Sequence, residues 1–456
     1  MTRITALFAL CASVAALSAC GIDVPDLNNP PIEDLRDNPT RENVIAATTG
    51  LIIGQRGNVA AANGYVAQLG ILGREAYNFD GADPRFIGEL LAGPLQKGSP
   101  FGGNFWAGPY ANLHLGSLVV AGADTAAGFS DSERAGVKGF AHTMMALDLL
   151  RVIVTHDTVG AVIDVDNPVD ELAPIVGKDA VYAEIARLLD DSATELGAAG
   201  TAFAFPLPSG FTGFTTPASF LTFNRAIRAR VAVYTGDYAG ALTALGGSFL
   251  DDTVANLDGL NVGAYYTFST RPNDLTNGLV NSNIWAHPSL KADAQTNGAA
   301  VDARFTRKVR QLAMGDGAGM LESDLKFNAY SATAPVPIIR NEELLLLRAE
   351  ALWGLNDPAM LPAAIADLNR VRTISGGLAA LATTLTADQV EDELLYNRRY
   401  SLMFEGGHRW IDLRRFDRLT DLPLDREGHV RNQRYPIPQA ECDARPGEPA
   451  CTVESM

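Results

Sequence analysis

The sequence predicts an all-α fold in which helical hairpins stack on one side of the molecule and long loops form the other. Two observations favour this fold. Apolar residues recur at helical spacing in several long segments, with small residues where a second helix would approach. Between these segments lie stretches rich in glycine, proline and aromatic residues, in which strand-like alternation is confined to minor β-hairpins. Such hairpins bury their apolar stripes only by stacking on each other, so we expect one continuous scaffold.

The composition is that of a globular protein. The chain has 456 residues, of which 47% are hydrophobic and 20% are charged. Its formal net charge is −17. Because nucleic acids select basic surfaces, this charge argues against a nucleic-acid partner.

The N-terminus has the features of an export signal. Arg3 is followed by an apolar run from Ile4 to Leu17, which is too short to span a bilayer as a resident helix. The sequence Leu17-Ser18-Ala19-Cys20 then resembles a bacterial lipobox. We predict that residues 1–19 are a lipoprotein signal peptide and that Cys20 becomes the acylated N-terminus, carrying palmitate-type chains that anchor it to a membrane. The alternative is an ordinary signal peptide in which Cys20 has no role.

The rest of the chain is expected to form one domain, residues 39–456, behind a flexible tether of residues 20–38 that is rich in proline and asparagine. A helix is predicted to begin at Thr40 and another to cover 110–120. Ser130 and Glu133 form a capping box that opens a third helix. Asp179 is expected to cap a fourth helix, which runs to about residue 196.

Three helix pairs resemble tetratricopeptide units. They are predicted at 223–242, at 342–372, and from the helices at 131–152 and 179–196. We therefore place the helical scaffold mainly in residues 110–250 and 336–416. The loop-rich side is placed mainly in residues 54–109 and 255–335.

A charged helix is predicted near the C-terminus. Thr386 and Gln389 form its capping box, and Gly406-Gly407 is expected to end it. Arginines among large apolar groups are expected to be partly buried and paired with carboxylates. The predicted members of this structural ion network are Arg398, Arg399, Glu405, Arg409 and Asp412.

Candidate ligand-binding residues lie in the two loop-rich regions. A sugar needs flat aromatic faces for the apolar side of its ring and amide, carboxylate or guanidinium groups for its hydroxyls. The alternative for each aromatic residue is that it fills the core. The candidates are Tyr77, Asn78, Phe79, Asp80, Arg85 and Asn104 in the first region, and Trp285 with Asn281 and Asn283 in the second.

Cys442 and Cys451 are predicted to form a disulfide, since an exported protein meets an oxidising environment. No histidine stands at metal-ligand spacing from them. An acidic cluster could bind calcium weakly, but a solvated loop is the simpler interpretation; it comprises Asp164, Asp166, Asn167, Asp170 and Glu171. No other metal and no cofactor is expected.

The sequence contains no recognisable catalytic motif. It has no Gly-x-Ser-x-Gly elbow, no His-Glu-x-x-His pair and no Walker loop. The glycine-rich run at 315–319 is expected to be a flexible loop and not a nucleotide site. We therefore predict that the protein is not an enzyme.

Seven short motifs occur in a fixed order along the chain. They are Cys20, Trp106…Tyr110…Leu113, residues 302–305, 337–343 with 347–351, 366–372, 397–415 and 435–439. In this order they resemble the SusD/RagB family of outer-membrane lipoproteins over essentially the whole chain. Two departures from the family pattern are Asn397, where a glutamate is usual before the paired arginines, and the additional Gly407.

This resemblance implies a body of four tetratricopeptide-type hairpins, a SusD-like α/α superhelix. It implies a surface-exposed, lipid-anchored protein of the outer membrane that captures nutrient, most often oligosaccharide, and delivers it to a SusC-like TonB-dependent transporter. The loops of the family vary freely, so the resemblance assigns no ligand residue. An alternative is a protein-interaction scaffold or a peptide-binding lipoprotein.

Overall fold

The computed structural model describes residues 32–167 and 171–456. Within these residues the protein is mostly helical, which confirms the predicted all-α class. The predicted signal peptide, Cys20 and most of the predicted tether lie outside the described residues. The last part of that tether is not extended, since α2 covers Ile32–Asp37 and buries Leu35.

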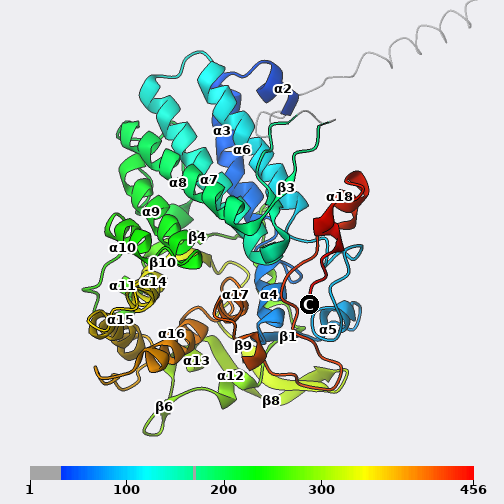
Figure 1. Ribbon diagram of the computed structural model, residues 1–456, viewed down its shortest axis with the longest axis vertical. Coiled ribbons are helices and arrows are strands. Elements are labelled where there is room, and N and C mark those ends of the chain that lie inside the picture. The colour runs from blue at the N-terminus through cyan, green and yellow to red at the C-terminus, as the bar shows by residue number, and fades with distance from the viewer. Residues whose placement is uncertain (1–31, 168–170) are drawn as a thin grey trace, which may run out of the picture.

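Ten helices stack in chain order along one side of the molecule, each against its neighbour (Figure 1). The predicted pairs α7/α8, α9/α10 and α14/α15 all form, and α3 with α6 makes a fourth pair. The stack consists of α3 (Arg41–Arg56), α6 (Ala107–Thr125), α7 (Asp131–His156), α8 (Lys178–Ala198), α9 (Pro217–Tyr234), α10 (Tyr238–Gly246), α14 (Asn341–Gly354), α15 (Leu361–Ile374), α16 (Ala387–Ser401) and α17 (His408–Arg415).

Short helices connect and cover this stack. They are α4 (Tyr65–Leu72), α5 (Arg85–Gly88), α11 (Leu257–Leu260), α12 (Ser289–Ala292), α13 (Ala303–Lys308) and α18 (Gln439–Ala444), with 3-10 turns η1 (Asp157–Val159), η2 (Ser209–Phe211), η3 (Gly278–Val280), η4 (Leu419–Asp421) and η5 (Pro449–Thr452).

The helix starts follow the predicted caps in most cases. Thr40, Ser130 and Thr386 each accept a hydrogen bond from the backbone three residues on, and each belongs to a complete capping box. The prediction for Asp179 was wrong: α8 begins at Lys178 after Gly177, and Asp179 lies in its first turn. An acidic residue there still favours the helix through the dipole.

The C-terminal charged helix ends earlier than predicted. α16 stops at Ser401, and Gly406-Gly407 lies in the connection to α17. Gly407 adopts a φ of +74°, and a Cβ at this position would lie 2.4 Å from the Cβ of Leu69. Glycine is therefore required here both by the backbone and by the close approach of α4.

Strands in the described residues form five two-stranded antiparallel sheets. Two are local hairpins, whereas β1/β5 and β4/β10 join segments far apart in the chain. The glycine-rich run at 315–319, predicted to be a flexible loop, is instead largely the end of strand β8 and its turn. The strands are β1 (Ala76–Asn78) with β5 (Ile284–Ala286), β4 (Gly263–Tyr266) with β10 (Val336–Arg340), β2 (Ala161–Val162) with β3 (Ile175–Val176), β6 (Thr296–Asn297) with β7 (Ala300–Val301), and β8 (Val309–Ala318) with β9 (Leu321–Phe327).

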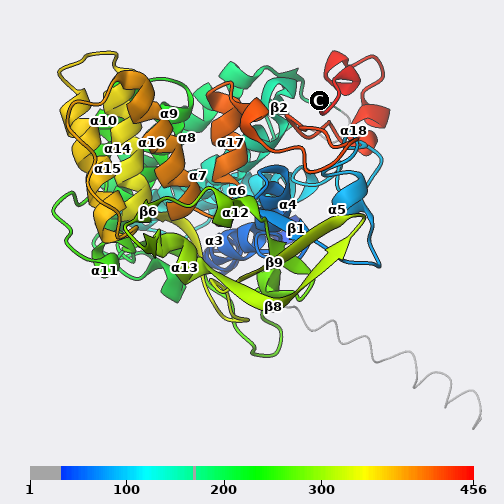
Figure 2. The same cartoon turned by 90° about the horizontal axis from the view of Figure 1, so that it is seen from below.

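The parts of the loop-rich regions that contain β1, α5, β8 and β9 lie away from α10, α14 and α15, whereas α11 lies beside α14 (Figure 2). One large apolar core runs from the stack into these loops, and a smaller core lies between α11, α14, α15 and α16. None of the helices in the described residues has both the length and the apolar character needed to cross a bilayer.

Candidate ligand-binding surface

The two predicted ligand regions meet in the structure. Strand β1 of the first region pairs with β5 of the second, and Tyr77 lies directly opposite Trp285 in this register. Strand β9 packs against β5 in turn. This arrangement joins residues more than 200 positions apart into one surface, which we call the loop face.

The aromatic candidates form the base of this face. Tyr77, Phe79 and Trp285 are 3%, 7% and 7% exposed, and Asn78 is also buried. The rings of Tyr77 and Phe79 pack at 5.3 Å, and Lys326 Nζ lies 4.1 Å from the centre of the Trp285 indole. As placed, these rings are covered, so they are core residues and not open stacking platforms for a sugar.

A polar cluster fixes Tyr77 in this position. The Nε2 atom of His287 lies 3.0 Å from both the Tyr77 hydroxyl and Asp425 Oδ1. Burial lowers the pKa of His287, although the carboxylate of Asp425 acts in the opposite direction. Asp425 was not predicted from the sequence. It lies in the loop that follows α17, and no local motif indicates its contact with His287.

The remaining candidates have accessible side chains. The side chains of the remaining polar candidates are all partly exposed: Asp80, Arg85, Asn104, Asn281 and Asn283. Arg85 forms a bidentate pair with Asp83 at 2.8 Å and lies over the ring of Phe101. Guanidinium, carboxylate and amide groups at an accessible surface are the groups that bind sugar hydroxyls.

A broad hollow of about 840 Å³ lies against the β8–β9 hairpin. Pro288 and residues 315–324 line it, so carboxylates of Asp316 and Glu322 stand beside the side chain of Met320. Met320 is 87% exposed. The hollow combines polar groups with an accessible apolar side chain, and its volume is that of a small-molecule site.

A C-terminal loop holds the loop face together. Asn432 donates from its side-chain amide to the carbonyls of Glu89, Leu90 and Gly93, and the guanidinium of Arg426 donates to the Gly319 carbonyl at the hairpin tip. The segment that follows α17 therefore contacts both the 85–104 loop and the β8–β9 hairpin.

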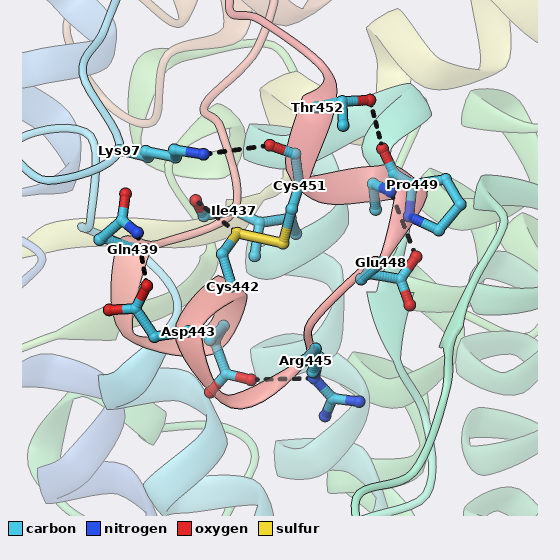
Figure 3. The surroundings of a disulfide bond; sticks show 12 residues. Lys97, Ile437, Gln439, Cys442, Asp443, Arg445, Glu448, Pro449, Cys451 and Thr452 are labelled. Atoms are coloured by element: carbon cyan, nitrogen blue, oxygen red, sulfur yellow. Dashed lines mark hydrogen bonds and ion pairs between the residues drawn. A yellow bond between two sulfur atoms is a disulfide. The ribbon is translucent and has the colours of Figure 1, made fainter.

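The predicted disulfide is present in the structure, where it joins α18 to η5 (Figure 3). The Cα atoms of Cys442 and Cys451 are 5.6 Å apart. Lys97 Nζ donates to the Cys451 carbonyl at 3.3 Å, which connects this C-terminal loop to the 85–104 region. In the same loop Arg445 forms an ion pair with Glu441 at 3.3 Å.

The predicted ion network is divided between two buried clusters. In the first, Glu350 forms ion pairs with Arg398 and Arg415, and Asp412 pairs with the same two arginines at 3.1 and 2.9 Å. In the second, Glu405 pairs with Lys308 at 2.6 Å and with Arg340 at 3.2 Å. Arg399 pairs instead with Asp293 at 2.7 Å.

Arg409 does not belong to either cluster, so its assignment to the network was wrong. Within the described residues no ion pair includes its guanidinium, and its Nη1 atom has no hydrogen-bond partner. The residue is nevertheless only 9% exposed.

No group of three or more metal-ligating side chains is arranged to hold an ion within residues 32–167 and 171–456. Asp164, Asp166, Asn167 and Glu171 belong to the described part of the chain, whereas Asp170 lies outside it. Calcium binding therefore stays a prediction.

Taken together, the helical stack and the loop face define a class of protein: a helical-repeat scaffold that presents a loop-built surface. Comparison with known proteins shows which family this chain resembles. Residues 321–447 match the model of the SusD family. This confirms the predicted resemblance over a region that contains the whole Glu350 cluster and the Glu405–Arg340 pair. No curated protein matches the sequence.

Solved structures share the fold over nearly the whole chain. A SusD superfamily protein from Bacteroides vulgatus has a TM-score of 0.65 at 14% identity, covering 91% of this chain and 98% of the other. NanU from B. fragilis has a TM-score of 0.66 at 16% identity, with coverages of 93% and 97%. A laminarin-binding SusD-like protein has a TM-score of 0.63 at 17% identity, with coverages of 89% and 98%.

Proposed function

We propose that this protein captures nutrient glycans at the outer membrane and delivers them to a SusC-like TonB-dependent transporter. The observation that carries this proposal is the SusD fold over nearly the full chain, together with a family match at its C-terminal part. One protein of this fold binds laminarin, which supports a glycan as the class of ligand.

The loop face supports the same role. Its loops carry accessible carboxylate, guanidinium and amide groups, and its β8–β9 hairpin borders a hollow of small-molecule size. Most of the helical stack lies on a different side of the molecule (Figure 1), and we expect the transporter to bind there. We place the ligand at Asp80, Arg85, Asn104 and the hairpin hollow, and we assign no catalytic step to these residues.

The lipid anchor at Cys20 and the outward orientation belong to this proposal. They rest on the lipobox-like sequence and on the likeness to the SusD family. Protease added to intact cells should release the protein, and purification in mild detergent should recover a large β-barrel protein with it. Protection from protease in intact cells combined with release by osmotic shock would contradict the location.

A glycan screen tests the ligand class. The full chain in detergent should show a raised melting temperature with at least one soluble oligosaccharide and no release of reducing ends on long incubation. A protein-interaction scaffold would show an unchanged melting temperature across all glycans and peptides, and a peptide-binding protein would respond to peptides alone.

A further inference from the structure

A second pocket, of about 230 Å³, lies outside the loop face, between α16, α17, the residue that follows α12, and η4. Three arginines and four aspartates line it: Arg399, Arg409 and Arg418, with Asp293, Asp392, Asp412 and Asp421. Leu395, Tyr396 and Leu413 form its apolar wall. The pocket therefore combines charged groups of both signs with a partly apolar lining at the size of a single small molecule.

Most charges at the pocket already have partners. Arg418 is held by Asp392 at 2.6 Å and by Asp421 at 2.8 Å, and Arg399 is held by Asp293 at 2.7 Å. These pairs stand at the pocket's edge, because Asp392, Asp421 and Asp293 have side chains that are 63%, 44% and 50% exposed. The carboxylates of Asp392, Asp421 and Asp293 therefore neutralise the positive charges of Arg418 and Arg399.

Arg409 is different, because it is a buried cation without a matching anion. It is 9% exposed, and its Nη1 atom lacks a hydrogen-bond partner among the residues that the structure describes. Asp412 is a buried carboxylate of this pocket, but it pairs with Arg398 and Arg415 and not with Arg409. A buried charge without hydrogen-bonded compensation is unfavourable, so an anion that reached Arg409 would be stabilised strongly.

Glu75 compensates Arg409 only in part. Burial raises the pKa of Glu75 to about 7, so a large fraction of this carboxyl is protonated near neutral pH. Burial and the charge of Arg399 lower the pKa of Arg409 to about 9, which still leaves the guanidinium charged at neutral pH. Glu75 Oε2 also has no hydrogen-bond partner among the described residues.

We propose that this pocket binds a compact sugar carboxylate of the hexuronate type, with the carboxylate at Arg409 and the ring against Tyr396 and Leu413. A planar guanidinium matches a carboxylate with two parallel hydrogen bonds. The tyrosine ring and the leucine offer apolar surface to the C–H side of the sugar. The site lies on elements that the loop face does not use, so it does not depend on the proposed glycan surface.

Calorimetric titration of the full chain in detergent tests this site, with glucuronate as the probe and glucose as the matched neutral sugar. We expect saturable glucuronate binding, at least tenfold weaker binding of glucose, and a loss of affinity as salt is raised. The Arg409→Gln variant should bind glucuronate at least tenfold more weakly. The control Arg187→Gln, on the exposed face of α8, should bind as the unmodified protein does.

A second variant covers the case in which Arg409→Gln does not fold, as judged by circular dichroism. Arg418→Gln removes one charge at the partly exposed rim, so it should keep the melting temperature and weaken glucuronate binding severalfold. The proposal fails if the unmodified protein does not bind glucuronate, if glucose binds equally well, or if folded Arg409→Gln or Arg418→Gln binds glucuronate unchanged.

Discussion

At the residue scale, Glu350 is a carboxylate whose side chain is fully buried between Arg398 and Arg415. Glu350→Gln keeps the shape of the side chain and removes its negative charge. The buried guanidinium groups of Arg398 and Arg415 then share only the carboxylate of Asp412. We expect a loss of roughly 3–5 kcal/mol in the free energy of unfolding, measured with denaturant.

Asp421→Asn is the matched control, because it removes a carboxylate from an ion pair whose Asp421 side chain is 44% exposed. It should cost less than about 1 kcal/mol. Equal losses from the two variants would show that the buried cluster does not stabilise the fold in the way that we describe.

The buried carboxyl of Glu75 should make the free energy of unfolding depend on pH. Burial raises its pKa to about 7, so the folded protein holds this proton more tightly than the unfolded chain does. Its contribution is full below about pH 4.5 and is lost as the pH rises through 7. Relative to Glu75→Gln, which does not titrate, the unmodified protein should lose roughly 3 kcal/mol over this range. A difference between the two proteins that is independent of pH would contradict the assignment.

The charged residues of the C-terminal helix could be predicted from sequence, but most of their partners could not. Arginines beside Trp410 and Phe416 indicated burial, and Arg398 and Arg415 are indeed buried or nearly so. Their main partner, Glu350, comes from another helix, and no local spacing encodes that contact. Arg304 shows the same limit, because its Nη1 donates to Asn397 Oδ1 at 2.8 Å across 93 residues.

At the element scale, helix starts were predicted better than helix ends. A capping box joins residues only three positions apart, so the local sequence was enough to predict helix starts at Thr40, Ser130 and Thr386. The end of α16 depends on where Phe404 and Gly407 must turn to pack on α4, which is a tertiary contact. The two glycines therefore indicated a turn but not its position.

Close packing of α7 on α8 provides an element-scale test. A Cβ added to Gly139 would lie 2.8 Å from Leu196 Cγ and 3.1 Å from the backbone nitrogen of Leu196. Gly139→Ala should therefore force the helices apart and cost roughly 1–3 kcal/mol of stability, measured by denaturant unfolding.

Gly197→Ala is the control on the same helix pair, since a Cβ there meets no atom within 4 Å. We expect it to be neutral or slightly stabilising, because alanine favours a helix over glycine. If Gly139→Ala were also neutral, the two helices would not be in the close contact that we describe.

At the scale of the whole molecule, the fold could be predicted because it is built from local units in a recognisable order. The loop face could be predicted only as two regions. Strands β1 and β5 join these two regions and place Tyr77 opposite Trp285. Neither short segment contains a sequence pattern that predicts this long-range pairing. The aromatic candidates are buried in the structure, so the accessible candidates are the polar ones: Asp80, Arg85, Asn104, Asn281 and Asn283.

The central claim is that the loop face captures a glycan, and one calorimetric titration tests it most directly. The full chain would be titrated with the oligosaccharide that gives the largest thermal shift, beside a variant with Asp80→Ala, Arg85→Ala and Asn104→Ala together. We predict saturable binding that the triple variant weakens at least tenfold at an unchanged melting temperature, while Arg187→Ala on α8 binds normally. Failure of every glycan to bind, or equal binding by the folded triple variant, would contradict the account.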